Sequence, residues 1–216
     1  MKTIKYINLF VLALVLMVLA PLTHAETPAT TAPASIPAPT GASGVVKNFY
    51  TQLADTMRDG DKLGFAGRYK KLEPAVTSAF NLSLMTRYAV GLVWSKATPD
   101  EQQQLVSAFS DFTIANYASQ FKKDDGEQFE VIDEKPASGG VIVETRLKPK
   151  EGEAVALNYL MKPDEKGQYR IVDVFLDGTI SQLATRRSEF SAIVNKDGVS
   201  ALVNSLGDKT KQMGPS

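Results

Sequence analysis

The spacing of apolar residues changes along this chain. Between residues 45 and 122, apolar side chains recur three and four positions apart, which is typical of one face of an α-helix. This spacing predicts four helices, with Pro74 breaking or kinking the second. The fourth has the clearest start, because Thr98, Pro99 and Glu101 form an N-cap, a first-turn proline and a capping box.

That fourth helix, which should end near Lys122, is apolar on more than one side. Leu105 and Phe109 belong to one stripe, whereas Tyr117 and Phe121 lie on another. A helix with two apolar stripes is covered by other parts of the protein on both of them. We therefore expect this helix to be packed on more than one side.

Beyond this helix, apolar residues recur at every second position. Apolar and polar side chains alternate over residues 128–133, 141–148, 154–161 and 169–176, which predicts four β-strands. Short connections rich in glycine and proline indicate an antiparallel meander, and two more helices should close the chain. Helices, a meander and helices again make an α+β domain, with the helices packed on one curved four-stranded antiparallel sheet.

The N-terminus has a pattern of its own. Lys2 and Lys5 precede an apolar run over residues 9–20, and small residues flank His24. A positive start, a short apolar run and small residues at a cleavage site are typical of secretory signal peptides. We expect residues 1–25 to be a signal peptide that is cleaved on export, with an uncleaved N-terminal anchor as the alternative.

The signal peptide is followed by a segment of low complexity. Residues 26–44 consist almost entirely of Pro, Thr, Ala, Ser and Gly and contain no aromatic residue, which predicts a disordered linker. Residues 45–212 would then form the single folded domain.

Composition narrows the chemistry. The chain has 24 basic and 24 acidic residues, one histidine and no cysteine. Because His24 lies in the expected signal peptide, the exported chain would have neither an imidazole nor a thiol. This argues against disulfides, Ser-His-Asp or Cys-His catalysis and Cys- or His-based metal sites, while the balanced charge argues against nucleic acid. We therefore expect no enzyme, no catalytic residue, no metal ion and no cofactor.

One acidic residue interrupts the apolar pattern of the last strand. The carboxylate of Asp173 shares a face with apolar side chains, so it must be paired or hydrogen-bonded. We expect Arg186 or Arg187 as its partner and interpret the pair as a staple between sheet and helix. The less favoured interpretation is a functional acid in an NTF2-like enzyme, with Tyr88 and Tyr159 as the other ionisable candidates.

Apolar residues from many segments should converge on the sheet. Periodicity does not distinguish a filled core from a hollow one, and composition alone favours the filled core. The residues expected at this position are Met85, Tyr88, Leu92, Val93, Trp94, Phe109, Phe112, Tyr159, Met161, Val174 and Phe175.

Several short motifs occur in an order that resembles the MlaC family, also called the toluene-tolerance family, over residues 45–212. The motifs are Phe80-Asn81-Leu82, Gly91-Leu92-Val93-Trp94, Thr98-Pro99-Asp100-Glu101-Gln102, Tyr169-Arg170-Ile171-Val172-Asp173-Val174, Asp177-Gly178-Thr179-Ile180-Ser181 and Arg187-Ser188-Glu189-Phe190. The last two look closest to the hopanoid-associated HpnM branch. Thr179-Ile180 departs from the more compact Gly-Val-Ser of the family.

The resemblance implies a periplasmic lipid carrier with an NTF2-like shape and an apolar cavity, which the eleven residues given above would line. The implied ligand is a phospholipid or a hopanoid, shuttled between the inner and outer membranes. The implied partners are an inner-membrane ABC-type lipid transport complex and an outer-membrane lipoprotein complex. The alternative is an adaptor domain of a membrane transport complex that has a solid core and carries no lipid.

Overall fold

A computed structural model describes residues 41–214, and the expected signal peptide and most of the expected linker lie outside them. The described chain forms, in order, α1 (Ala42–Arg58), α2 (Gly60–Ala79), α3 (Leu82–Val90), the 3-10 helix η1 (Gly91–Ser95), α4 (Pro99–Gln120), β1 (Gln128–Ala137), β2 (Gly140–Lys148), β3 (Val155–Pro163), β4 (Tyr169–Leu176), β5 (Ile180–Ser181) and α5 (Gln182–Met213). Since α1 begins at Ala42, the folded domain starts three residues before the expected boundary.

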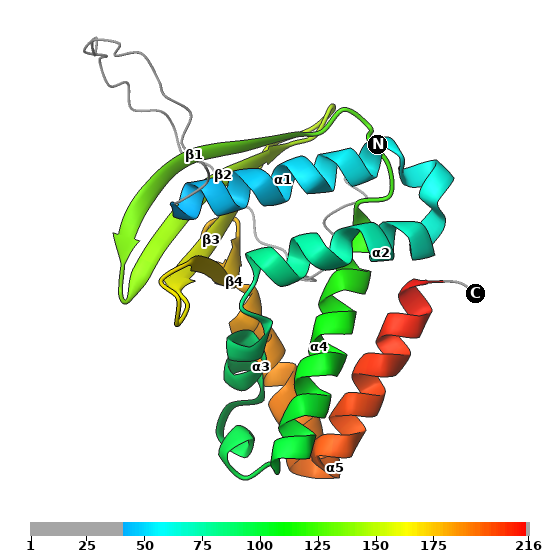
Figure 1. The fold of residues 1–216 in the computed structure, drawn as a ribbon, viewed down its shortest axis with the longest axis vertical. Helices are drawn as coiled ribbons and strands as arrows, with labels where there is room; N and C mark the ends of the chain where they lie inside the picture. The colour runs from blue at the N-terminus through cyan, green and yellow to red at the C-terminus, as the bar shows by residue number, and fades with distance from the viewer. Residues whose placement is uncertain (1–40, 215–216) are drawn as a thin grey trace.

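The strands form one antiparallel sheet in the order β1-β2-β3-β4-β5, so the predicted meander is confirmed. The sheet has five strands rather than four, because the two residues of β5 pair with the end of β4. The long strands β1 and β2 curve around α1, and the remaining helices lie on the same side of the sheet (Figure 1). This is the α+β arrangement that the sequence predicts, with helices on one face of a curved sheet.

The register of β4 shifts in its middle. Met161 of β3 pairs with Ile171, whereas Tyr159, two residues earlier in β3, pairs with Val174. One extra residue, Val172, is therefore accommodated in β4 as a β-bulge. Because side chains on a strand alternate between faces, the bulge puts Val174 rather than Phe175 on the same face as Tyr159.

The two long helices α2 and α5 are bent at glycines. In α2 the break falls at Gly64, whose φ is 59°, and the helix continues through Pro74, so the expected break at Pro74 is wrong. Pro74 lies on the exposed face, where water can satisfy the carbonyl group that loses its helical partner. In α5, Gly198 has a φ of 84° and divides the element into the two closing helices that the sequence predicts.

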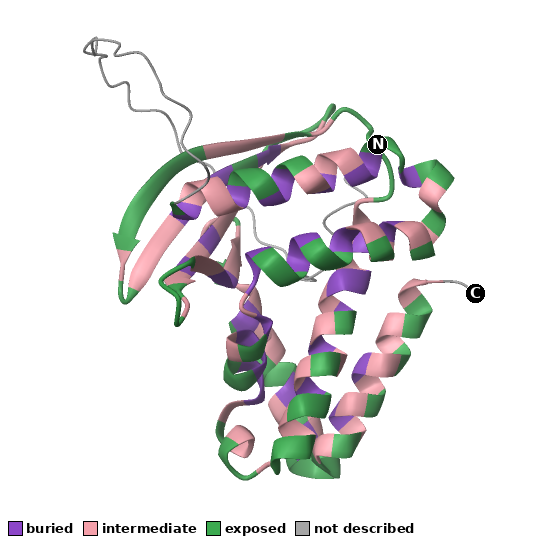
Figure 2. Ribbon diagram, in the orientation of Figure 1, coloured by how far each residue is buried: buried purple, intermediate pink, exposed green. Residues whose placement is uncertain are grey.

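Helix α4 is packed on more than one side, as its two apolar stripes indicate. On one side Phe109 meets Phe190 of α5 edge to face, with ring centroids 6.1 Å apart. On another, Tyr117 stacks on Phe121 and contacts Phe49 of α1. Buried residues accordingly run along the facing sides of α1, α2, α4 and α5 (Figure 2). In the described part of the chain, no helix is long and apolar enough to cross a membrane.

The start of α4 has the predicted capping box. The Thr98 side chain accepts a hydrogen bond from the backbone N–H of Glu101, whose carboxylate accepts one from the backbone N–H of Thr98. We expect Thr98→Ala to lower the free energy of unfolding by about 1 kcal/mol, because it leaves a helix-end N–H without its partner. Chemical denaturation measures this loss. An unchanged free energy of unfolding would show that the cap contributes nothing to stability.

Candidate functional site

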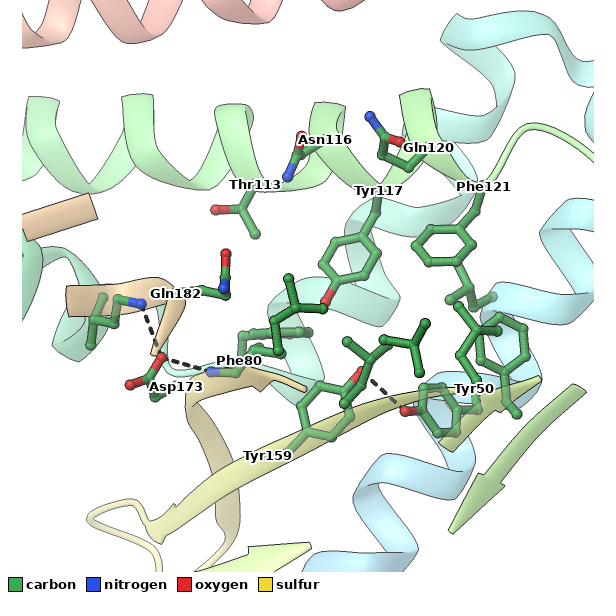
Figure 3. Close-up of a pocket in the computed structure, with 18 of the residues that line it drawn as sticks. Tyr50, Phe80, Thr113, Asn116, Tyr117, Gln120, Phe121, Tyr159, Asp173 and Gln182 are labelled. Carbon is green, nitrogen blue, oxygen red and sulfur yellow. Dashed lines mark hydrogen bonds between the residues drawn. The ribbon is translucent and has the colours of Figure 1, made fainter. Parts of the chain in front are cut away.

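A cavity of about 180 Å³ lies between the sheet and the helices (Figure 3). Its lining includes residues of α1, α3, α4 and α5 and of strands β1 to β4. Of the 24 lining residues, 17 are aliphatic, aromatic or proline. A water molecule occupies about 30 Å³ in the liquid and needs several polar partners, so this space suits an apolar ligand better than buried water.

The cavity is elongated along α4. Lining residues occur from Phe109 on this helix to Phe121, the residue that directly follows it, and α4 passes over the site (Figure 3). At 1.5 Å per residue, these twelve steps span about 18 Å. Such a shape suits an extended apolar chain.

Hydroxyl groups gather at the sheet side of the cavity. The Tyr50 hydroxyl lies 2.6 Å from Thr145 Oγ1 and 3.2 Å from the hydroxyl of Tyr159 (Figure 3). The Thr145 hydroxyl in turn donates to the carbonyl of Leu157. Burial raises the pKa of Tyr50 to about 12 and raises the pKa of Tyr117 and Tyr159 as well. These phenols therefore stay neutral at neutral pH and present an uncharged surface to a ligand.

Asp173 is buried at the end of the cavity near the start of α5. Its carboxylate accepts hydrogen bonds from the backbone N–H of Val174, the backbone N–H of Leu183 and the hydroxyl of Ser181. Asp173 thus joins β4 to the first turn of α5, which confirms the staple between sheet and helix. Its hydrogen-bond donors are a hydroxyl and two amides, however, rather than the expected guanidinium group of Arg186 or Arg187.

The carboxyl of Asp173 gives stability a defined pH dependence. Burial raises its pKa above the ordinary value, although the hydrogen bonds from Ser181, Leu183 and Val174 oppose the shift. The folded state therefore keeps this proton at pH values at which the unfolded state has lost it. The contribution of Asp173 to the free energy of unfolding should fall as the pH rises from about 3.9 through the raised pKa, and then stay constant.

We expect Asp173→Asn to remove this titration. The free energy of unfolding of the original protein minus that of the variant should decrease with rising pH in that window and level off above it. Chemical denaturation at a series of pH values measures the difference, in which the contributions of other carboxyl groups cancel. A difference that increases with pH would contradict the raised pKa.

Polar side chains line one side of the cavity. Thr113, Asn116 and Gln120 are spaced three and four residues apart on α4 and so share one face, while Gln182 and Arg186 share a face of α5. All five are only partly buried, so this side lies close to solvent. The cavity therefore joins an apolar interior to a polar margin.

Arg186 is the largest polar side chain of this margin. The side chain is 11% exposed, its guanidinium group lies 4.9 Å from the centre of the Phe112 ring, and Nη1 is 2.7 Å from Oε2 of Glu189. Burial lowers the pKa of Arg186, which Glu189 partly offsets. An arginine nevertheless stays charged at neutral pH, so the margin has a fixed positive group.

The structure places five of the eleven predicted residues in the cavity lining. They are Met85, Phe109, Phe112, Tyr159 and Val174. The other six, Tyr88, Leu92, Val93, Trp94, Met161 and Phe175, are outside it, and the reasons differ between the helical segment and the strands.

Four of these six belong to the end of α3 and to η1. Gly91 ends α3 with a φ of 68°, and the chain then turns away from the cavity into η1. Leu92 is 82% exposed as a result, while Val93 and Trp94 pack partly buried against the core. Tyr88, before the turn, is 40% exposed. Helical spacing continued across Gly91 accounts for the expectation for Leu92, Val93 and Trp94, whereas Tyr88 lies within α3 on its exposed side.

The other two belong to the strands. Met161 is fully buried in the core, where it pairs with Ile171 beyond the cavity. An unbroken alternation would place Phe175 on the face of the sheet that borders the cavity. Because of the bulge at Val172, Val174 and Leu176 lie on that face instead.

Several lining residues were not among those predicted. The apolar ones are Tyr50, Leu53, Phe80, Tyr117, Phe121, Phe129, Leu147, Pro149, Val155, Leu157, Leu176 and Leu183. The second stripe of α4 did mark Tyr117 and Phe121 as covered positions. On the strands, residues that line the cavity alternate in the same way as residues buried in the filled core. Only their position in the assembled fold distinguishes lining residues from core residues.

Among the described residues, no group of three His, Cys, Asp or Glu side chains is arranged to hold a metal ion. The carboxylates that line the cavity are Asp173, bound to the start of α5, and Glu127, just before β1. The arrangement is therefore suited to binding an elongated apolar molecule with a polar end.

Comparison with known proteins gave a family and several solved structures of similar fold. The family model described as MlaC protein matches residues 47–208, about three quarters of the chain. A phospholipid-binding protein from Ralstonia solanacearum, solved in complex with a phospholipid, has 23% sequence identity and a TM-score of 0.70. The match covers 80% of this chain and 98% of that one, so the two share a fold. A search of curated protein sequences gave no significant match.

Proposed function

Because this chain belongs to the MlaC family, we propose that it binds a lipid in the cavity and carries it between the two membranes of a cell envelope. The observation that carries the proposal is the elongated apolar cavity with a polar margin on one side. The comparison supports it as well, since a protein of the same fold was solved with a phospholipid bound.

The physical requirement on a lipid carrier is an interior that replaces the membrane. Each methylene group moved from water into an apolar environment contributes about 0.8 kcal/mol, so a lipid leaves a bilayer only for an equally apolar site. The aromatic and aliphatic lining supplies that environment, and the polar margin near Thr113 and Asn116 lets the headgroup remain near water. Binding of this kind needs no covalent chemistry, and we propose a carrier rather than an enzyme.

The proposed location is the periplasm, with residues 1–25 as the export signal. The proposed partners are an inner-membrane ABC-type lipid transport complex and an outer-membrane lipoprotein complex, as the family implies. The proposed cargo is a phospholipid or, if the chain belongs to the HpnM branch, a hopanoid. Mass measurement of the exported protein would show whether the segment that ends at Ala25 has been removed.

Native mass spectrometry of freshly purified protein, followed by organic extraction, tests lipid binding directly. We expect a species heavier than the chain by the mass of one lipid, and the same lipid in the extract. Purified protein that carries no lipid, and acquires none from vesicles of mixed phospholipids, would contradict the proposal.

The alternative is an adaptor that docks on a transport complex without carrying lipid. The exposed apolar side chains of Tyr88 and Leu92, at the end of α3 and in η1, favour a contact surface there. A pull-down that captures a membrane transport complex with lipid-free protein would support this function. Loss of that capture in Leu92→Ser, with lipid binding unchanged, would show that docking and carrying use separate surfaces.

A further inference from the structure

We propose that the end of α3 and η1 form a surface that binds an anionic lipid bilayer directly, with Leu92 inserted among the acyl chains. This surface, the α3–η1 patch, is made up of two apolar and three basic side chains, all of them exposed: Tyr88, Leu92, Arg87, Lys96 and Arg187. Such a contact goes beyond the proposed function, which assigns docking to protein complexes, and it holds whether or not the cavity carries a lipid.

Tyr88 and Leu92 are neighbouring exposed apolar side chains. Among the described residues, four large apolar side chains are exposed, and these two are only four positions apart. Leu92 is 82% exposed, whereas Ile132, the next most exposed of the four, is 51% exposed. A single exposed leucine is ordinary on a protein surface, but two apolar side chains at one turn of the chain form a patch that a partner can cover.

The exposure of Leu92 is fixed by the structure around it. Gly91, with a φ of 68°, ends α3 and turns the chain away from the cavity. Val93 and Trp94 then pack against the core, and Nε2 of Gln102 donates a hydrogen bond to the carbonyl oxygen of Trp94 at 2.9 Å, which ties η1 to α4. Leu92 is therefore presented by a braced turn and can enter a bilayer without rearrangement of the backbone around it.

The chain around η1 is basic. Residues 74–99 contain two basic residues, Arg87 and Lys96, and no acidic one. Both are exposed, and they flank η1 in the sequence. The next acidic residues, Asp100 and Glu101, belong to the first turn of α4, where the positive end of the helix dipole offsets their charge.

A third cation comes from α5. The Nε atom of Arg187 lies 3.3 Å from the position that a Cβ atom at Gly91 would occupy, so the guanidinium group is next to η1. In the part of the chain that the structure describes, no acidic side chain forms an ion pair with Arg187, Arg87 or Lys96. The three are therefore available to lipid phosphates, and each Lys or Arg near an anionic surface strengthens binding about fivefold.

Tyr88 extends the patch along α3. Nζ of Lys162, from β3, lies 6.0 Å from the centre of the Tyr88 ring. Tyrosine is enriched where proteins meet lipid headgroups, because its ring is apolar and its hydroxyl is polar, and lysine is attracted to anionic headgroups. Since Met85 of the same helix lines the cavity, a bilayer bound here would lie within one helix diameter, about 10 Å, of the cavity wall.

A bilayer fits the patch better than a protein partner does. A stable protein interface buries about 800 Å² on each partner. It also needs a pocket of matching shape for a protruding side chain such as Leu92. The apolar part of the patch is only two side chains, whereas fluid hydrocarbon accepts a protruding leucine without a preformed pocket. Tyr88 and the three cations would then remain at the level of the headgroups.

Trp94 provides a local reporter for the test, because it is the only tryptophan of the chain and lies two residues from Leu92. Vesicles of phosphatidylcholine and phosphatidylglycerol with brominated acyl chains should quench its emission. Binding to vesicles of brominated phosphatidylcholine alone should be at least about tenfold weaker, because the attraction of the three cations is lost. Attachment through another segment, such as residues 9–20, does not bring η1 to the bilayer and does not give this signal.

Three variants test the patch itself. Leu92→Ser should weaken binding to the mixed vesicles about tenfold, because it removes the burial of one leucine side chain. Lys96→Gln should weaken it about fivefold, because it removes one cation. Ile132→Ser is the matched control, since it also replaces an exposed apolar side chain, but on β1, at the other end of the molecule from η1 (Figure 1). It should leave binding unchanged, and thermal unfolding should show that all three variants stay folded.

The outcomes separate this contact from the proposed function. Absence of quenching in the original protein, equal quenching by neutral and anionic vesicles, or full quenching in Leu92→Ser would each overturn the bilayer contact. Capture of a membrane transport complex that depends on Leu92, without binding to vesicles, would assign the patch to a protein partner and overturn it as well. Binding to vesicles by a protein that carries no lipid in native mass spectrometry would contradict the carrier and support the patch.

Discussion

Val174→Trp should remove bound lipid from the purified protein, with lipid occupancy falling at least tenfold. Val174 lines the cavity from β4, directly opposite Tyr159 of β3. An indole at this position extends into the empty space and occupies the volume that an acyl chain would need. Because it fills a cavity rather than a packed core, it should cost little stability. Native mass spectrometry measures occupancy, and thermal unfolding measures stability.

The matched control is the next residue of the same strand. Phe175 is outside the cavity lining, because the bulge turns it to the other face of β4. Phe175→Trp enlarges a side chain in the same strand and should leave lipid occupancy unchanged. Equal loss in both variants would indicate a general disturbance of β4, and no loss in Val174→Trp would show that the cavity is not the lipid site.

Phe49→Ala should cost about 3–5 kcal/mol of the free energy of unfolding, the loss typical of removing a buried phenylalanine. The Phe49 side chain is 1% exposed and meets the rings of Phe80 and Tyr117 edge to face, each with centroids 5.2 Å away. Phe80 and Tyr117 in turn line the cavity, so Phe49 supports two wall residues from behind. Lipid affinity should fall together with stability.

The control for this variant lies on the same helix. Lys47 is exposed on α1, and Lys47→Ala should change the free energy of unfolding by no more than about 0.5 kcal/mol. Chemical denaturation of both variants gives the comparison. A cost below about 1 kcal/mol for Phe49→Ala would show that the space closes by repacking and that the wall does not depend on this ring.

Much of the fold can be predicted from sequence, because its elements have strong local signals. The alternation from Val141 to Lys148 and the capping box at Thr98 depend only on neighbouring residues, and both predictions are confirmed. The break in α2 was expected at Pro74, because proline is the stronger helix breaker, but it occurs at Gly64. Whether a helix tolerates a proline depends on whether the proline lies on its exposed face, which the local sequence does not show. The two-residue strand β5 is too short to have a periodicity.

The cavity was harder to predict, because hollowness is a property of the assembled molecule. Whether Tyr159 contacts a neighbour or an empty space depends on side chains from distant segments. Of the two predicted residues Val174 and Phe175, only Val174 lines the cavity, because β4 contains a single extra residue, and an alternating pattern contains no sign of such a bulge. Leu92 was misplaced because helical spacing was continued past the positive φ of Gly91.

The cavity wall also has a consequence for the order of folding. The hairpins of the meander need only nearby contacts and can form early, whereas the hydrogen bonds of Tyr50 with Thr145 and Tyr159 join residues 95 and 109 positions apart. A chain in which only the meander has formed has a sheet but no enclosed space. Lipid can therefore enter only after the helices have docked, and bound lipid then stabilises the native state alone.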